Sequence, residues 1–197
     1  AIARLLGDAG PSPDEAQCYP LLEALGVPVA AWRFVPADAA PTVLREAASA
    51  LPAPWVLKAC SADLPHKTDA GAVALDIHDA DELQAIATRM SDRMRADRPA
   101  ARVRGWLVQQ QVRAVGELLL GLRRDPVVGP IVVVASGGVE AELLDDVVVA
   151  PAPLDAGRAR AMLGELRLLP RLTGYRGHPL GDLDALAQAI AAFSRLA

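Results

Sequence analysis

Two lysines lie close together in a chain whose other basic residues are all arginine. Lys58 lies inside the apolar run 55–60, and Lys67 follows nine residues later in a polar segment. A lysine ammonium is a compact charge that suits a single phosphate oxygen, whereas the guanidinium of arginine is a planar fork. A lysine in the middle of a strand either lies along the strand edge or points into a cleft. We therefore expect Lys58 to point into a cleft and contact a phosphate, with Lys67 near it.

Lys67 belongs to the run His66-Lys67-Thr68-Asp69, and Gly71 closes the segment. An imidazole, an ammonium, a hydroxyl and a carboxylate therefore lie within four residues. Such a set can hold a phosphate, or it can make the imidazole nucleophilic by orienting its second nitrogen. Both interpretations make His66, Lys67 and Asp69 the candidate catalytic residues.

Glycines and carboxylates follow an apolar, β-branched run in the second half of the chain. Gly137 and Gly138 could present backbone N–H groups to a phosphate, although they match no known phosphate-loop fingerprint. Glu140 and Glu142 share one face if the segment is extended, and Asp146 follows four residues after Glu142. Such carboxylates suit a Mg²⁺ ion that bridges nucleotide phosphates, which needs one or two carboxylates besides water. A solvated acidic edge is the alternative interpretation.

The composition sets the class of protein. The 197 residues are 52% hydrophobic and 22% charged, which is the balance of a folded domain with a sizeable core. The net charge of −4 gives no reason to expect a nucleic acid or an anionic membrane, and no apolar run approaches the roughly 20 residues of a membrane span. Two cysteines cannot build a disulfide framework. We expect a cytoplasmic protein, and the first residue, which is not Met, indicates a domain of a longer polypeptide.

Helix and strand signals alternate along the chain. Capping patterns predict helices that begin after Ser12 and Asp79, and the first of these should end at Gly26. Further helices are expected at 41–51, 156–166 and 183–196, and strands at 27–34, 55–60, 72–77, 105–112, 117–122 and 131–135. The alternation favours an α/β fold with an antiparallel element around 105–122.

Together these segments resemble the ATP-grasp domain of acyl-CoA synthetases that form a nucleoside diphosphate, the β-subunit type of ADP-forming acetate–CoA ligase. The resemblance covers residues 21–197 and rests on the order and spacing of several motifs. These are Val56-Leu57-Lys58, His66-Lys67-Thr68-Asp69-Ala70-Gly71-Ala72-Val73, Gly116-Glu117-Leu118, Arg124-Asp125-Pro126-Val127-Val128-Gly129-Pro130, Gly137-Gly138, Glu142-Leu143-Leu144-Asp145-Asp146-Val147, Pro153-Leu154 and Gly174-Tyr175-Arg176-Gly177.

The resemblance implies a single ATP-grasp domain over residues 1–197, an α/β fold in which two α+β lobes grip ATP or ADP. The lobes would be roughly 28–103 and 104–197. Lys58 would contact the nucleotide phosphates, and Glu142 and Asp146 would hold Mg²⁺. The other implied nucleotide contacts are Gln109, Gln110 and Val112 beside the adenine, with Glu117, Gly137 and Gly138.

The implied reaction converts a carboxylic acid, ATP and CoA into acyl-CoA, ADP and phosphate through a phosphohistidine. The main phosphohistidine would belong to CoA-binding and CoA-ligase domains, or to a subunit, outside this chain. His66 matches the family's second histidine, which is proposed to accept or relay the phosphoryl group near the nucleotide. The chain would then be part of a ligase and incomplete on its own, with Lys58, Lys67 and Mg²⁺ neutralising the transferred group.

Departures from the family pattern leave a second function open. Ala150 stands where the family usually has an arginine, and Ala135-Ser136 stands where it has Gly-Leu. Loss of a phosphate-neutralising charge favours nucleotide binding over turnover. That would fit a regulatory ATP-grasp-like domain in a protein acetyltransferase fused to a degenerate synthetase. A carboxylate–amine ligase is disfavoured, since those enzymes lack the His-Lys-Thr-Asp loop.

Overall fold

The computed structural model describes residues 2–9, 13–64, 67–68, 70–138, 145–177 and 179–197. The chain forms two compact units, one of residues 1–24 and 29–112 and the other of residues 25–28 and 113–197. The expected lobe boundary at 103/104 is therefore too early, because the strand that follows it pairs within the first unit. Each unit has its own sheet and its own core.

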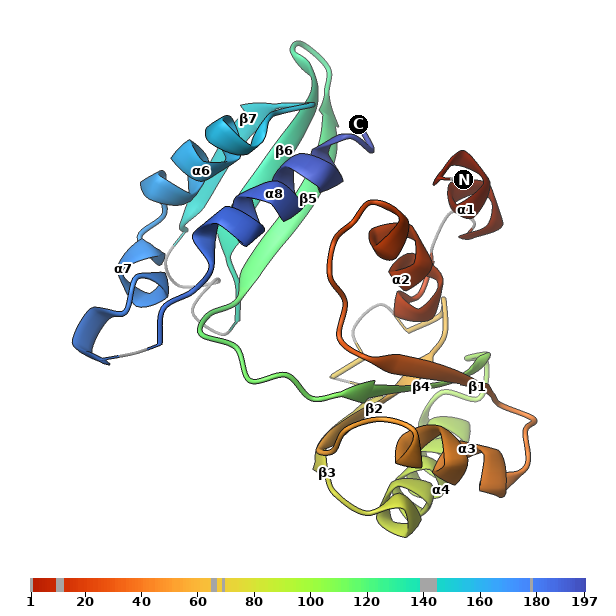
Figure 1. The fold of residues 1–197 in the computed structure, drawn as a ribbon. Coiled ribbons are helices and arrows are strands. Elements are labelled where there is room, and N and C mark those ends of the chain that lie inside the picture. Colours follow the sequence, from red (N-terminus) through yellow and green to blue (C-terminus); the bar gives the residue numbers. More distant parts are fainter. Residues whose placement is uncertain (1, 10–12, 65–66, 69, 139–144, 178) are drawn as a thin grey trace. The chain divides into compact units, whose positions relative to one another are not determined.

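The first unit is built on a four-stranded antiparallel sheet in the order β1-β4-β2-β3 (Figure 1). Its elements, in chain order, are α1 (Ile2–Ala9), α2 (Glu15–Ala24), β1 (Trp32–Pro36), α3 (Pro41–Ser49), β2 (Trp55–Cys60), β3 (Val73–Ile77), α4 (Ala80–Asp97) and β4 (Gly105–Gln110). Strand β4 lies between β1 and β2, so the last strand of this unit is also a central one.

The two faces of this sheet are covered by different helices. Successive side chains of a strand point to opposite faces. Leu57 and Ala59 of β2 belong to the larger core, with α3 and α4. Cys60 and Leu107 belong to a smaller cluster, with residues of α2. Lys58 lies two positions before Cys60 and therefore shares the α2 face.

Helix α2 begins at an acidic cap. The Oδ1 atom of Asp14 accepts the N–H of Gln17 at 3.1 Å, and the Gln17 side chain accepts the N–H of Asp14 in return. This reciprocal pattern is a capping box. The capping residue is therefore Asp14 and not Ser12, which lies outside the described residues. The helix ends at Ala24, and Gly26 has a φ of 78°, as the sequence predicts.

The same carboxylate joins α2 to the sheet. Arg104 donates from Nη2 to both Asp14 oxygens at 2.8 Å and from Nε to Oδ2 at 3.1 Å. Its guanidinium also lies over the Phe34 ring, 4.1 Å from the ring centroid. Gly105 follows, and a Cβ atom there would overlap the carbonyl oxygen of Val35. The start of β4 therefore packs tightly between α2 and β1.

The second unit is built on a three-stranded antiparallel sheet in the order β5-β6-β7 (Figure 1). Its elements are β5 (Leu118–Asp125), β6 (Gly129–Ser136), β7 (Val147–Pro151), α6 (Ala156–Glu165), α7 (Leu169–Leu172), the 3-10 turn η1 (Tyr175–Gly177) and α8 (Leu183–Ser194). Val132 and Val134 pack beneath α6 and α8. The opposite face is apolar and open: Leu119 is 55% exposed, and Val147 and Val149 are each 48% exposed.

Most of the expected helices and strands are confirmed, and the differences have physical causes. The strand expected at 27–34 begins only at Trp32, and Pro28, within the expected span, has no N–H to give to a ladder. The strand over Val147–Pro151 was not expected, since the acidic segment before it resembles a solvated edge. The strands around 105–122 are not one antiparallel pair but belong to different sheets. Among the described residues, no helix is long and apolar enough to cross a membrane.

We expect Arg104→Ala to lower the free energy of unfolding by about 2 kcal/mol, because a buried carboxylate loses its charged hydrogen-bond partner. Urea denaturation measures the change. The matched control is Asp81→Ala, which breaks the exposed Arg45–Asp81 ion pair and should cost at most about 1 kcal/mol. Equal losses in the two variants would show that Asp14 and Arg104 do not anchor α2.

Candidate functional site

Lys58 lies in the middle of β2, on the face of the sheet that α2 partly covers. Its register partners are Val73 on β3 and Leu107 on β4. The side chain is partly buried, and it makes no ion pair with a carboxylate of the residues that the structure describes. A partly dehydrated ammonium without a counter-ion is a favourable place for an anion.

Gln109 shares this face with Lys58. It is opposite Val56 on β2, two positions along the ladder from the Lys58–Leu107 pair, so the Lys58 and Gln109 side chains are diagonal neighbours. The Oε1 atom of Gln109 accepts the hydroxyl of Tyr19 on α2 at 2.8 Å. Burial chiefly, and then nearby negative charges, raise the pKa of Tyr19 to about 12. The phenol therefore stays protonated and acts as a donor that fixes Gln109.

The other residues of the expected adenine hinge point elsewhere. Gln110 is opposite Trp55 and so faces the α3 and α4 side of the sheet. Val112 follows the end of β4 and is exposed. Between them, the Gln111 side chain accepts the N–H of Asp76 at 2.6 Å. Of the three expected contacts, only Gln109 lies on the face that carries Lys58.

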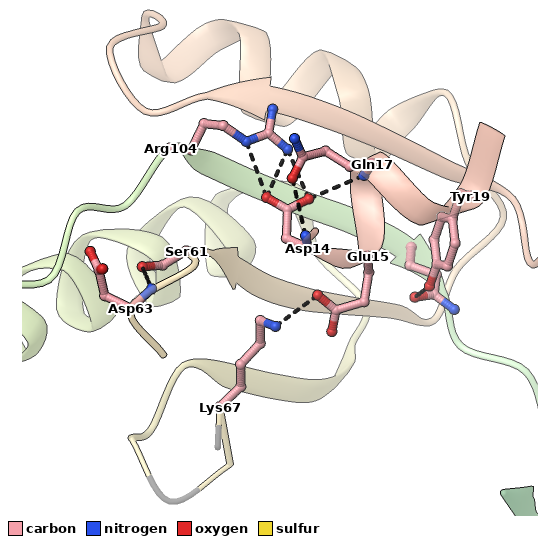
Figure 2. Close-up of polar contacts among 9 residues, drawn as sticks. Asp14, Glu15, Gln17, Tyr19, Ser61, Asp63, Lys67 and Arg104 are labelled. Atoms are coloured by element: carbon pink, nitrogen blue, oxygen red, sulfur yellow. Dashed lines mark hydrogen bonds and ion pairs between the residues drawn. The ribbon is translucent and has the colours of Figure 1, made fainter. Parts of the chain in front are cut away.

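The loop that carries Lys67 is closed by two backbone hydrogen bonds. Ala72 donates to the carbonyl of Lys67 at 2.8 Å, and Gly71, at a φ of 62°, donates to that of Thr68 at 3.0 Å. From this loop the Lys67 side chain reaches α2, where its Nζ lies 2.8 Å from Oε2 of Glu15 (Figure 2). The other two expected catalytic residues, His66 and Asp69, lie outside the described residues.

The charges at the start of α2 surround Cys60. Burial chiefly raises the pKa of this thiol to about 12. The carboxylates of Asp14 and Glu15 add to the shift, while Arg104 and Lys67 oppose it. The thiol is therefore protonated at neutral pH and is not a nucleophile. Figure 2 shows the two ion pairs, Lys67–Glu15 and Arg104–Asp14, at the helix start. The charges of both pairs act on the buried Cys60 thiol.

In the second unit, Glu117, Gly137 and Gly138 come together where β5 begins and β6 ends. The N–H of Gly137 donates to the carbonyl of Glu117 at 2.7 Å. A Cβ atom on Gly137 would lie 2.9 Å from the carbonyl carbon of Glu117, and one on Gly138 would lie 3.1 Å from its Oε2. Because the two glycines have no side chains, the backbone and carboxylate of Glu117 can lie close to them. These three expected nucleotide contacts form one cluster.

Asp146 has a structural set of partners. It is 5% exposed, and its carboxylate accepts the Ser136 hydroxyl and the N–H groups of Arg167, at 2.8 Å, and Leu168, at 3.1 Å. Burial alone would raise the pKa of Asp146, but these hydrogen bonds outweigh it and hold the pKa below its ordinary value. A metal ion would have to compete with these donors. The Mg²⁺ role of Asp146 stays a prediction, and Glu142 lies outside the described residues.

Ala150 is 2% exposed and belongs to the core beneath α6 and α8. A side chain at this position points away from the open face of the sheet. An arginine there would have to leave the core to meet a ligand on that face. The expectation that Ala150 removes a phosphate-neutralising charge from the site therefore has no support in this geometry.

Sequence reasoning missed the partners of the expected residues. Glu15, Tyr19 and Arg104 belong to no phosphate-binding motif. Their contacts join residues far apart along the chain, with Tyr19 and Gln109 separated by 90 positions. The one sequence signal for these contacts is the alternation of side chains along β2 and β4, which indicates the residues that share a face of the sheet. Within the described residues, no three His, Cys, Asp or Glu side chains gather into a metal site.

Comparison with known proteins gives one consistent match. A family model described as an ATP-grasp domain matches residues 8–197. The chain is 36% identical over 182 residues to acetate–CoA ligase [ADP-forming] I of Archaeoglobus fulgidus, covering 92% of this chain and 26% of that protein. It is 32% identical over 132 residues to the β subunit of acetate–CoA ligase [ADP-forming] I of Pyrococcus furiosus, covering 67% of this chain and 57% of the subunit.

Solved structures agree with these relatives. Acetyl-coenzyme A synthetase 1 of Ca. Korarchaeum cryptofilum, in complex with coenzyme A and Ca-AMPCP, superposes with a TM-score of 0.85 at 29% identity, covering 92% of this chain and 78% of that one. A second structure of that enzyme holds coenzyme A and Mg-AMPPCP, with a phosphohistidine segment pointing towards the nucleotide-binding site. It superposes with a TM-score of 0.81 at 28% identity, covering 100% of this chain and 85% of that one.

We expect Asp146→Asn to lower the free energy of unfolding by about 2 kcal/mol at pH 7, because an amide cannot accept from all three donors. The lowered folded-state pKa adds stability above the pKa of the unfolded chain, and that stability is lost as the pH falls through the folded value. The difference in the free energy of unfolding between wild type and Asp146→Asn should therefore become smaller below about pH 4. Urea denaturation at a series of pH values tests this, and a constant gap would contradict it.

Gly137→Ala should destabilise the second unit by about 1–3 kcal/mol, because the added methyl group meets the backbone of Glu117. Gly164→Ala is the matched control. That glycine lies in α6 with open space around it, so alanine should be neutral or stabilising by up to about 1 kcal/mol. Thermal unfolding of both variants measures the difference. An unchanged Gly137→Ala protein would show that the Glu117 contact is not tight.

Proposed function

Because this chain belongs to the ATP-grasp domain family, we propose that it is the nucleotide-binding and phosphoryl-transfer part of an ADP-forming acyl-CoA synthetase. The overall reaction would join a carboxylic acid to CoA while ATP becomes ADP and phosphate. Both ADP-forming relatives above are acetate–CoA ligases, and the chain spans 26% and 57% of their lengths. Its own part of the reaction would be the exchange of a phosphoryl group between ATP and a histidine.

The observation that carries this proposal is the ammonium of Lys58, which pairs with no carboxylate among the residues that the structure describes. It lies partly buried in β2, beside a glutamine that Tyr19 holds in place. A phosphate oxygen would supply the missing counter-ion, and a nucleotide base or ribose would find hydrogen-bonding groups nearby. The Korarchaeum enzyme forms complexes with the nucleotide analogues Ca-AMPCP and Mg-AMPPCP. Nucleotide binding is therefore the function that we assign to this face.

His66 and the two lysines would carry the transfer step. A ring nitrogen of neutral His66 attacks the γ-phosphorus as the bond to the ADP oxygen breaks, which yields phosphohistidine and ADP. Asp69 orients the other ring nitrogen. Lys58 and Lys67 neutralise the oxygens of the group in transit. The phosphoryl group then passes to a histidine of the partner domain.

Mg²⁺ would add to this neutralisation of charge. It needs only one or two protein carboxylates besides the phosphates, so the lack of a three-residue metal cluster among the described residues is compatible with it. Glu142 is the carboxylate that we propose as its ligand. Asp146, whose oxygens are engaged by three donors, would instead fix the end of β6 to the segment before α7.

The proposed partners are CoA-binding and CoA-ligase domains, or a subunit, that carry the main phosphohistidine. A structure of the Korarchaeum enzyme contains coenzyme A and a phosphorylated phosphohistidine segment. The alternative, a regulatory domain of a protein acetyltransferase, drew its support from the missing arginine at position 150. Since that position lies in the core, the catalytic proposal is the better supported one.

Lys58→Ala should weaken the binding of Mg-ATP and Mg-ADP by about tenfold or more, because a charged contact to phosphate is lost. Calorimetric titration of each nucleotide into wild type and variant measures the dissociation constants. Arg45→Ala is the control, since it removes an exposed cation on α3 that pairs with Asp81. Equal affinities in wild type and Lys58→Ala, or no binding by wild type, would refute the proposed site.

A further inference from the structure

The ion pair between Lys67 and Glu15 differs from the surface pairs of this chain. Its N–O distance is 2.8 Å, and the two side chains are only 17% and 31% exposed. In the Arg45–Asp81 pair, which has the same distance, the carboxylate is 79% exposed. A partly dehydrated pair is screened less by water and salt than an exposed one. The Lys67 ammonium is therefore held in one place more firmly than a surface lysine.

The glutamate side of this pair is fixed by the start of α2. The residue before Glu15 is Asp14, which closes the capping box with Gln17 and pairs with Arg104. One helical turn later, Tyr19 donates to Gln109 of β4. Glu15 thus lies between two attachments of the helix to the sheet (Figure 2). Its carboxylate has little freedom to follow a moving lysine.

The lysine side is fixed by its loop. The carbonyl of Lys67 accepts the N–H of Ala72, the residue before β3, so the lysine backbone is joined directly to the sheet. Lys58 lies in the neighbouring strand, opposite Val73. Both lysines are thus presented from adjoining parts of one sheet, yet only Lys67 has a carboxylate partner among the described residues.

We propose that Glu15 is a positioning residue of the phosphate site, which holds the Lys67 ammonium in the place from which it contacts the transferred phosphoryl group. This inference rests on the proposed function, because it assumes that Lys67 meets a phosphate. A free lysine side chain loses much rotational freedom when it binds an anion. With Glu15 in place, that ordering is completed when the chain folds, and the phosphate meets a preorganised cation.

The chain offers a direct way to observe this, because Lys58 and Lys67 are its only lysines. A protein labelled with ¹³C and ¹⁵N in its lysines gives at most two side-chain ammonium signals and two Cε signals in NMR spectra, and Lys58→Arg assigns them. We expect a Lys67 ammonium signal that survives near neutral pH, because the ammonium is partly buried and held in an ion pair with Glu15. In Glu15→Gln this signal should be lost to exchange with water, while the Cε signal of Lys58, whose hydrogens do not exchange, is unchanged.

Glu23→Gln is the matched control, since Glu23 lies on the same helix and accepts a hydrogen bond from Trp32 instead. Its Lys67 signal should match that of wild type. A Lys67 signal that is equally sharp in Glu15→Gln overturns the positioning role, whatever Lys58 does. Separately, a Lys58 Cε signal that does not move at saturating Mg-ADP overturns the proposed nucleotide site.

Affinity distinguishes positioning from a merely structural ion pair. Glu15→Gln should weaken Mg-ATP binding about threefold, the scale of one partly exposed charge pair. In a Lys67→Met background the same change should have no further effect, because Glu15 acts only through Lys67. Tighter binding by Glu15→Gln would mean that the glutamate competes with phosphate for the lysine. That result, or an equal effect in both backgrounds, overturns the proposal.

Discussion

The ion pair between Asp14 and Arg104 determines where helix α2 lies on the first sheet, and the charged groups of that face follow from it. The pair joins the cap of the helix to the residue before β4, and the close packing at Gly105 leaves no room for the strand to shift. Once the helix start is fixed, Glu15 meets Lys67 and Tyr19 meets Gln109. A carboxylate that the sequence presents as a helix signal thus organises a set of contacts between remote parts of the chain.

The sequence predicts local structure well because local structure depends on near neighbours. The cap at Asp79, the turn at Gly26 and the apolar strand around Lys58 are all specified within a few residues. The motifs also indicate the ATP-grasp domain family, because their order and spacing match the family even where single residues differ. What neighbours cannot specify is pairing, and so the strands around 105–122 were placed together although they belong to different sheets.

Residue roles were harder to predict, because a motif does not say which way a side chain points. Gln109 and Gln110 are adjacent in the sequence but lie on opposite faces of β4. Asp146 has the type and spacing of a metal ligand, yet three donors engage its oxygens. The family pattern predicts that position 150 belongs to the site, but its side chain packs in a core. In each case the alternation of faces and the hydrogen-bond partners decide the role.

The open face of the sheet β5–β7 has a thermodynamic consequence. Leu119, Val147 and Val149 leave apolar surface in contact with water on the side that α6 and α8 do not cover. A ligand that binds to this face removes the apolar surface from water, which lowers the heat capacity. The binding enthalpy of such a ligand therefore becomes more favourable as the temperature rises. Contacts to lysine ammonium groups alone do not carry this signature. The temperature dependence of a binding enthalpy would therefore report whether a ligand covers the second sheet or meets only the cations of the first.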